Sequence, residues 1–270
     1  MMKAELELQI QDEYLEVAAQ AALVGGAICE KYFEQKLQAE SKDTSNLVTA
    51  ADIESEQAIV DLIQSQFPGH NILAEENQKA AIESEDLWIV DPLDGTNNFA
   101  HQVPHFAVSI GYWKNGSPQC GVIYNPVRHD FYYAAKGQGA YSGQDRLEVS
   151  SAESMSECLI GCGFYYDRGE MMRSTLKAVE ACFEKNIHGI RRFGTASLDL
   201  IQVASGRYGG FFEYRLAPWD FAAGRLFIEE AGGKITTCEG HELGLDQSTI
   251  LATNGKVHDE MFDIVNRFLP

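Results

Sequence analysis

Basic residues are scarce in this chain. Its 270 residues include 21 Lys and Arg against 40 Asp and Glu, which gives a formal net charge of −19. Such an acidic surface disfavours nucleic acid and anionic membranes as main partners, because both would be repelled. An anionic ligand is compatible with this charge where bound cations reverse the local field. The charge balance therefore predicts a protein that binds cations.

The sequence also lacks closely paired cysteines and long apolar runs. Its six cysteines are widely spaced, without a C-x-x-C pair, and no signal peptide precedes them, so we expect free buried thiols. The longest apolar stretch, about residues 18–29, contains Gln20 and two glycines and falls short of a membrane span. We expect a cytoplasmic protein that does not associate with membranes.

Hydrophobic periodicity predicts two parts of the chain with different arrangements of helices and strands. Apolar residues four and three apart predict a first helix over residues 10–28, and a second helix follows, with Asp52 at its entrance. Alternating strands over residues 106–135 predict an antiparallel meander. Strands and helices then alternate to the end of the chain. We therefore expect an α/β protein with an N-terminal α+β subdomain, residues 1–146, and a C-terminal α/β subdomain, residues 147–270.

Residues 88–99 form the segment with the clearest indication of a functional site. Its apolar start predicts a short buried strand, and Asp91 and Asp94 follow on a turn stiffened by Pro92 and closed by Gly95. Two carboxylates so close repel each other unless hard cations lie between them. The N–H groups of Gly95 and Thr96 suit a phosphate at a helix start. The alternative is an ordinary Asx-rich turn.

Two further acidic residues lie, like this pair, at the junction between predicted elements. Glu75 follows a predicted strand at residues 71–74, and Asp220 lies in the first turn of a predicted helix. Each has an ordinary explanation alone, as a solvated strand end or as an acid favoured by the helix dipole. Together they predict a cage for two hard cations about 3.5–4 Å apart.

Two longer motifs connect these acids to a known family. They are D-P-x-D-G-T-x-N-F at residues 91–99 and W-D-x-A-A-G-x-x-x-x-E-A-G-G at residues 219–233. Leu47-Val48-Thr49 leading to Asp52, Gly194-Thr195-Ala196 and Glu213 support them. Over nearly its whole length the chain resembles the inositol monophosphatase family of Mg²⁺-dependent, lithium-sensitive phosphatases. This resemblance implies a layered αβαβα sandwich of the inositol monophosphatase and fructose-1,6-bisphosphatase type, and a homodimer.

The resemblance also implies a role for each site residue. Two Mg²⁺ ions, with three as the alternative number, would be held by Glu75, Asp91, Asp94, Asp220 and the carbonyl of Leu93. Thr96, hydrogen-bonded to Asp52, would orient the attacking water, and the carboxylates, Glu75 among them, would help to take its proton. The amides of Gly95 and Thr96 would hold the phosphate.

On the substrate side, the resemblance implies contacts from Gly194, Thr195 and Ala196 to substrate hydroxyls, and from Asp94 and Asp220 to the bound ester. Glu213 would accept a hydrogen bond from an inositol ring hydroxyl. Thr195 has an alternative explanation as a helix N-cap.

Three departures from the family pattern bear on this assignment. Lys42 is displaced relative to the run Asn46-Leu47-Val48-Thr49, which bears on the third metal position, and Ala74 replaces the usual Gly before the Glu pair. Tyr214 and Arg215 follow Glu213, which would put a bulky cation near the pocket mouth. Arg215 could then bind a second phosphate, or pair with a surface acid.

The sequence thus predicts a phosphomonoesterase that releases phosphate from myo-inositol monophosphate, a small phosphorylated polyol. The alternative within the enzymes is a broader sugar phosphatase acting on fructose 1,6-bisphosphate, NADP or histidinol phosphate. The alternative outside them is a regulatory interaction protein that retains the fold.

Overall fold

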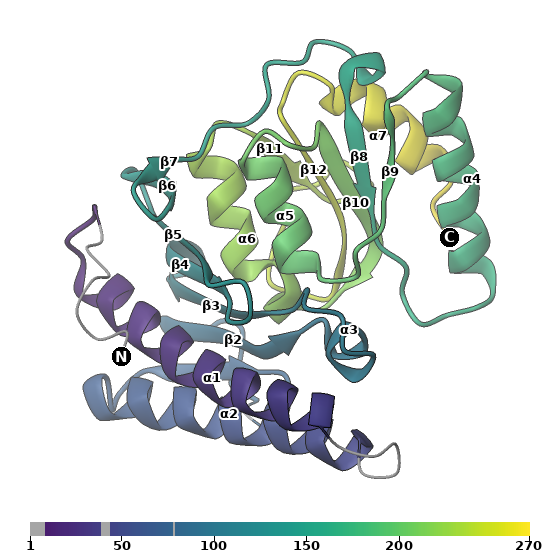
Figure 1. Cartoon of the computed structure of the whole chain (residues 1–270). Helices are drawn as coiled ribbons and strands as arrows, with labels where there is room; N and C mark the ends of the chain where they lie inside the picture. Colours follow the sequence, from purple (N-terminus) through teal and green to yellow (C-terminus); the bar gives the residue numbers. More distant parts are fainter. Residues whose placement is uncertain (1–8, 39–43, 78) are drawn as a thin grey trace.

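The computed structural model describes residues 9–38, 44–77 and 79–270 and shows five layers of helices and sheets (Figure 1). A helix pair covers the first sheet, a second pair lies between the two sheets, and a third pair covers the second sheet. These pairs are α1 (Glu13–Gln38) with α2 (Thr44–Gln66), α5 (Ala196–Ala204) with α6 (Pro218–Glu230), and α4 (Glu170–Glu184) with α7 (His258–Arg267). The expected layered α/β sandwich is confirmed.

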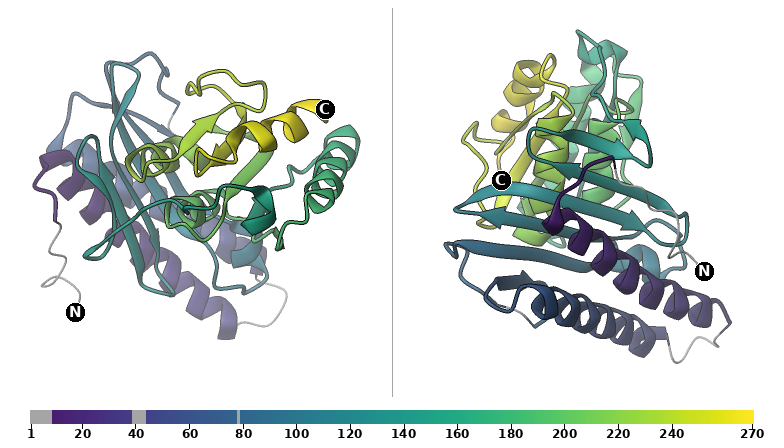
Figure 2. Two further views of the ribbon diagram at one scale, coloured as in Figure 1. Left: turned by 90° about the horizontal axis from the view of Figure 1, so that it is seen from above. Right: turned by 90° about the vertical axis from the view of Figure 1, so that its left-hand side faces the viewer.

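The first sheet has seven strands in sequence order, with α1 and α2 along one face (Figure 2). The strands are β1 (Asn71–Ala74), β2 (Asp86–Asp94), β3 (Ala107–Lys114), β4 (Ser117–Asn125), β5 (Asp130–Ala135), β6 (Gly139–Ser142) and β7 (Asp145–Arg146). Only β1 and β2 are parallel, and the predicted antiparallel meander follows from β2 onward. Strand β2 is longer than predicted and includes both Asp91 and Asp94.

The second sheet has five strands in the order β11-β12-β10-β8-β9. Their bounds are β8 (Leu159–Cys162), β9 (Gly189–Arg191), β10 (Gly210–Leu216), β11 (Lys234–Thr236) and β12 (Ser248–Thr253). Two short helices complete the elements, α3 (Thr96–Ala100) and the 3₁₀ turn η1 (Met155–Glu157). Strand β9 was not predicted, because three residues carry too little periodicity to be recognised.

The start of α2 corrects one prediction. The helix begins at Thr44, so Leu47-Val48-Thr49 is helical and Asp52 lies well inside the helix rather than at its entrance. The β-branched residues of this segment lower its helix propensity, but the extensive packing of α2 against α1 outweighs that preference. Lys42 lies outside the described residues.

Two chain-wide expectations can be compared with the fold. All six cysteines are buried and free, as expected. Among the helices that the structure describes, none combines the length and apolarity needed to cross a bilayer. The division into subdomains at residues 146 and 147 stays a proposal, and it would fall between the last strand of the first sheet and the first strand of the second.

A pair of glycines lets α6 lie directly on the first sheet. Gly111 and Gly121 face each other across β3 and β4. A Cβ at Gly111 would lie 3.2 Å from the Ala223 nitrogen, and one at Gly121 would lie 3.3 Å from the Ala223 Cβ. The absence of side chains therefore sets how closely α6, which carries Asp220 in its first turn, approaches β2.

We expect Gly111→Val to lower the free energy of unfolding by about 1–3 kcal/mol, because the added atoms force α6 away from the sheet. Chemical denaturation measures this change. Gly69→Val is the matched control, since no atom lies within 4 Å of a Cβ at that position. Equal stability of the two variants would contradict the packing assigned to α6.

Candidate functional site

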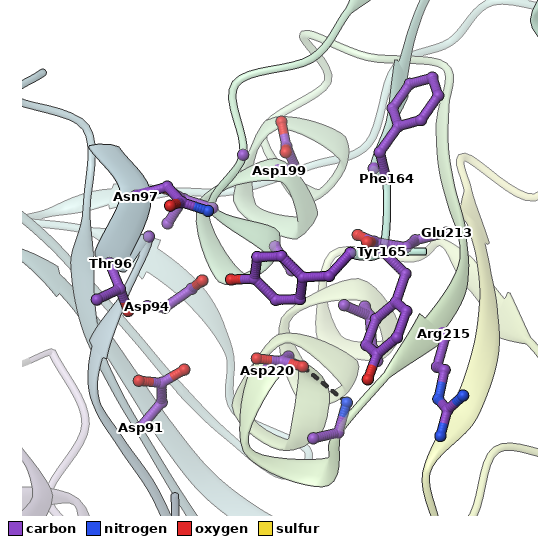
Figure 3. A pocket seen from close by; sticks show the side chains of 18 of the residues that line it. Asp91, Asp94, Thr96, Asn97, Phe164, Tyr165, Asp199, Glu213, Arg215 and Asp220 are labelled. Atoms are coloured by element: carbon purple, nitrogen blue, oxygen red, sulfur yellow. Dashed lines mark hydrogen bonds between the residues drawn. The ribbon is translucent and has the colours of Figure 1, made fainter. Parts of the chain in front are cut away.

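Three carboxylates from two elements meet at one end of the first sheet, those of Asp91 and Asp94 buried and that of Asp220 half-buried. Asp91 and Asp94 come from β2 and Asp220 comes from the first turn of α6. Each offers a carboxylate oxygen within 4.8 Å of the others, and their side chains face one another in the close view (Figure 3). The three acids that the sequence predicts as metal ligands therefore lie close together in the structure, and their role as ligands stays a prediction.

An irregularity in β2 explains how two acids three residues apart share one face. Residues three apart on a regular strand point to opposite faces. Asp91 pairs with Ser109 and Asp94 pairs with Ala107, so β2 holds one more residue than β3 over this interval. The extra residue restores a common direction for the two side chains.

Each of these acids is held in place by hydrogen bonds from the chain. The Leu93 N–H donates to Oδ1 of Asp91 at 3.0 Å. Ser197 donates to Oδ2 of Asp94 from both its N–H, at 2.7 Å, and its hydroxyl, at 2.5 Å. The Ala217 N–H donates to Oδ2 of Asp220 at 2.7 Å. The side chains are therefore oriented before any ligand binds.

Glu75 joins the cluster from the end of β1 and lines the same cavity. The turn that presents it is anchored by the buried carboxylate of Glu56, which accepts hydrogen bonds from the N–H groups of Glu76 and Asn77, both at 2.8 Å. Sequence reasoning did not identify Glu56. Its helical spacing from Asp52 on α2 was the available signal.

Burial makes this cluster costly to ionise. Desolvation, followed by repulsion from neighbouring acids, raises the pKa of Glu75 to about 7 and the pKa of Asp91 well above its ordinary value. Burial likewise raises the pKa of Asp220, and it raises the pKa of Asp94 to about 6 although hydrogen bonds from Ser197 act in the opposite direction. Within the described residues, no Lys or Arg forms an ion pair with any of the four.

The donor set fits a hard divalent cation. All four side chains offer oxygen only, and the compensating positive charge that buried carboxylates require is not supplied by an ion pair in the described part of the chain. A bound cation would relieve both the repulsion and the raised pKa values. The acidic cluster is therefore suited to metal binding.

The turn after β2 has the expected tight geometry. Gly95 adopts φ 94°, and a Cβ there would lie 2.4 Å from the Thr195 hydroxyl oxygen. The Thr195 hydroxyl does not cap α5, although Thr195 occupies the N-cap position. It donates instead to the His105 carbonyl at 2.8 Å. Gly95, Thr96, Gly194, Thr195 and Ala196 all line the cavity.

The expected hydrogen bond between Thr96 and Asp52 is replaced in this structure. The Thr96 hydroxyl donates to the Leu93 carbonyl at 3.2 Å, a local contact that a Thr three residues along the chain makes readily. Asp52 is buried inside α2 and is not among the described residues that line the cavity. Burial, with the charges of Glu76, Glu75 and Glu56, raises the pKa of Asp52 to about 8.

Glu213 lies in the cavity wall that the second sheet contributes. Its side chain is buried in β10, and burial together with the charge of Asp199 raises its pKa to about 8. A Cβ at Gly163 would lie only 1.7 Å from Oε2 of Glu213, so this carboxylate occupies space that a side chain would fill. Glu213 and the acidic cluster line one cavity of about 290 Å³, and the predicted contact of Glu213 with a substrate hydroxyl stays a prediction.

The two residues after Glu213 point in different directions. Tyr214 is buried in the core between the second sheet and α7, and its hydroxyl donates to the Val265 carbonyl at 2.9 Å. Tyr214 therefore points away from the cavity, because successive strand residues face opposite sides of a sheet. Arg215 does line the cavity. Its Nε donates to Gln247 at 2.8 Å and its guanidinium lies 4.8 Å from the centre of the Tyr165 ring.

Sequence reasoning missed several residues of this cavity. Asp199 on α5, Arg192 after β9, and the aromatic segment that follows β8 all line it. The aromatic segment consists of Phe164, Tyr165 and Tyr166. The position of Asp199 one turn after Thr195 was a usable signal, whereas nothing in the sequence indicates which way the aromatic segment folds.

Comparison with known proteins supports this geometry. The model of the inositol monophosphatase family matches residues 10–267. The inositol-1-monophosphatase of Synechocystis sp. is 39% identical over 251 residues, covering 92% of this chain and 87% of that protein. The Nus factor SuhB of Escherichia coli K12 is 35% identical over 264 residues, covering 94% and 98%.

A solved structure agrees with both. The inositol monophosphatase of Anabaena (Nostoc) sp. superimposes with a TM-score of 0.85 at 40% identity, covering 95% of this chain and 96% of that one. Given the family match over nearly the full length, this chain belongs to the inositol monophosphatase family.

Proposed function

We propose that this protein is a Mg²⁺-dependent phosphomonoesterase that converts myo-inositol monophosphate to inositol and phosphate. One observation carries the proposal: the Asp91, Asp94 and Asp220 carboxylates converge in the same cavity that Glu213 lines. The three carboxylates suit cations that bind phosphate, and Glu213 suits a hydroxylated leaving group. Family membership supports the reaction class.

The acidic cluster would hold two Mg²⁺ ions through Glu75, Asp91, Asp94 and Asp220. The Leu93 carbonyl can join them, since a carbonyl oxygen that accepts one hydrogen bond keeps a second lone pair. When bound, the ions would polarise the phosphate and neutralise charge on the leaving oxygen. Inhibition by Li⁺ and assembly as a homodimer belong to the same proposal.

The remaining chemistry falls to the chain itself. The amides of Gly95 and Thr96 would hold phosphate oxygens, and Gly194, Thr195 and Ala196 would position the alcohol. Glu75 would take a proton from the attacking water together with Thr96, and Asp52 would act with Glu75 through their mutual repulsion, since the charge of Glu75 helps to raise the pKa of Asp52 to about 8. Glu213 would accept a hydrogen bond from an inositol hydroxyl.

A second candidate substrate has two phosphates, as fructose 1,6-bisphosphate does. Arg215 supports it, because its guanidinium lines the cavity and makes no ion pair with any described acid. A fixed guanidinium is well suited to a phosphate.

A candidate from another class is a regulatory role like the one in the name of the Escherichia coli relative, Nus factor SuhB. The complete acidic cluster supports the enzyme instead. Phosphate release by purified protein distinguishes the two: no release from any ester with Mg²⁺ present would overturn the proposed function and favour the regulatory one.

We expect Asp91→Asn to lower phosphatase activity at least roughly 100-fold, since even changes to the outer partners of metal ligands cost 10- to 100-fold. The variant should be no less stable than the parent in EDTA, because Asn retains the acceptor for Leu93 and removes a repelling charge. Phosphate release and thermal melting measure the two effects. Full activity would contradict the metal assignment.

Stability should depend on pH in a direction set by the acids. The pKa values of Glu75 and Asp94, about 7 and about 6, exceed those of the unfolded chain, roughly 4. The folded protein therefore binds more protons between these values, and the free energy of unfolding falls as pH rises through that window.

Melting temperatures measured from about pH 5 to 8 should decline in EDTA and decline less with Mg²⁺, which binds the deprotonated acids. A melting temperature that does not change with pH in EDTA, and that Mg²⁺ does not raise at the alkaline end, would contradict metal binding by the acidic cluster.

A panel of phosphate esters, with Mg²⁺ and with added Li⁺, separates the candidate substrates. We expect inositol monophosphate to give the highest kcat/KM. Arg215→Met should lower kcat/KM for fructose 1,6-bisphosphate about 10-fold, the loss expected for one charge-assisted hydrogen bond, and leave inositol monophosphate nearly unchanged. Arg173→Met is the control, because Arg173 is exposed on α4 and does not line the cavity. Equal or greater activity on the bisphosphate would reverse the order of the two candidates.

A further inference from the structure

Lys79 is a cation beside the acidic cluster that the roles above do not use. Its Nζ donates to the Ala74 carbonyl at 3.2 Å and to the Glu75 carbonyl at 2.5 Å. Ala74 is the last residue of β1 and Glu75 follows it directly. The ammonium therefore holds the backbone at the point from which the Glu75 side chain leaves the strand.

The same ammonium reaches the helix that carries Asp220. Nζ of Lys79 lies 5.2 Å from the centre of the Trp219 ring, and Trp219 directly precedes Asp220 in the first turn of α6. A cation at this distance from an indole face is attracted by the electrons of the ring. Lys79 thus connects the end of β1 to the start of α6, two elements that each place an acid in the cavity.

Glu75 needs this support more than the other acids of the cluster do. The three aspartates each accept a hydrogen bond from a backbone N–H, whereas the hydrogen-bonding neighbour of the Glu75 carboxylate is another acid, Asp91. A Glu side chain also has one more rotatable bond than Asp to immobilise. Its direction therefore depends on the turn that carries it. Glu56 holds the N–H groups of that turn, and Lys79 holds its carbonyls.

Lys79 gives this support without occupying the atoms that a metal ion needs. Among the described residues it forms no ion pair with a carboxylate, since its donors go to carbonyl oxygens. Desolvation and then neighbouring acids raise the pKa of Glu75, and the charge of Lys79 acts in the opposite direction. An ammonium paired with the Glu75 carboxylate would compete with a cation for the same oxygens, whereas one bound to the carbonyl leaves them free.

We propose that Lys79 is a positioning residue for the metal site, which holds the Ala74 and Glu75 carbonyls against α6 and so fixes the Glu75 carboxylate for Mg²⁺. This inference rests on the metal site of the proposed function and adds a residue to it. Partners that orient metal ligands typically contribute about 10- to 100-fold to metal affinity. Simple charge repulsion makes the opposite prediction, because removing a cation near the cluster would strengthen Mg²⁺ binding.

The test measures Mg²⁺ binding to variants of the full chain by calorimetry, without substrate. Lys79→Met keeps the apolar stem and removes the donors and the charge, whereas Lys79→Arg keeps a cation that can donate to carbonyls and stack on Trp219. We expect Lys79→Met to raise the dissociation constant of Mg²⁺ at least about 10-fold. The Mg²⁺ concentration for half-maximal phosphate release should rise likewise, with a smaller change in kcat at saturating Mg²⁺. Lys79→Arg should lie closer to the parent.

Lys177→Met is the matched control, because Lys177 is exposed on α4 and does not line the cavity. It removes the same charge and should leave Mg²⁺ binding unchanged. An unchanged or lower dissociation constant for Lys79→Met would overturn the inference, and so would an equal loss of affinity in Lys177→Met. Melting in EDTA reports whether the variants fold. If Lys79→Met does not, the same comparison with Lys79→Gln, which is uncharged and shorter, decides.

Failure of the proposed function looks different. If the parent protein binds Mg²⁺ but releases no phosphate from any ester, the function falls and calorimetry still decides the inference. If the parent binds no Mg²⁺, both fall together. If the parent is a Mg²⁺-dependent phosphatase and Lys79→Met binds Mg²⁺ as the parent does, only the inference falls.

Discussion

Repulsion between desolvated carboxylates is the constraint on which this structure depends. Asp91, Asp94 and Asp220 are forced together by the chain. Desolvation raises the pKa of all three, and repulsion from neighbouring acids adds to the shift at Asp91 and Asp220. A chain with a net charge of −19 offers little positive charge to spare, and none of it pairs with these acids in the described residues. The fold therefore holds these acids in an arrangement that a bound cation or protonation relaxes, as is common at functional sites.

Packing enforces this arrangement from both sides. The extra residue in β2 turns two acids to one face, and the glycine pair of β3 and β4 brings α6 close enough to add the third. Ser197 then joins α5 to Asp94 through two hydrogen bonds. The layer of helices between the sheets is thus what unites acids from distant parts of the chain.

The sequence was sufficient for the fold class and for the meeting of the main site residues, because their motifs are long and each acid adjoins a strand end or a helix start. It was insufficient where a local pattern and the tertiary structure disagree. The β-branched run before Asp52 resembles extended chain, yet packing on α1 makes it helical.

Asp199 shows a further limit. Its spacing from Thr195 was a usable signal, but its place in the cavity wall depends on how α5 packs, which is a property of the three-dimensional fold. The aromatic segment after β8 is similar, since its composition gives no indication that it borders the cavity.

The anchoring hydrogen bonds have a consequence for ion selectivity. In Asp91, Asp94 and Asp220, one carboxylate oxygen is already occupied by a donor from the chain. The other oxygen of each acid is free of these bonds and keeps both lone pairs, so the bonds favour monodentate ligation through it without excluding bidentate chelation. Large Ca²⁺ ions, which rely on bidentate carboxylates and six to eight ligands, would gain less from such a site than a small octahedral ion that keeps several waters. Hydrogen bonding to one oxygen of each acid would thus bias the site toward ions of lower coordination number.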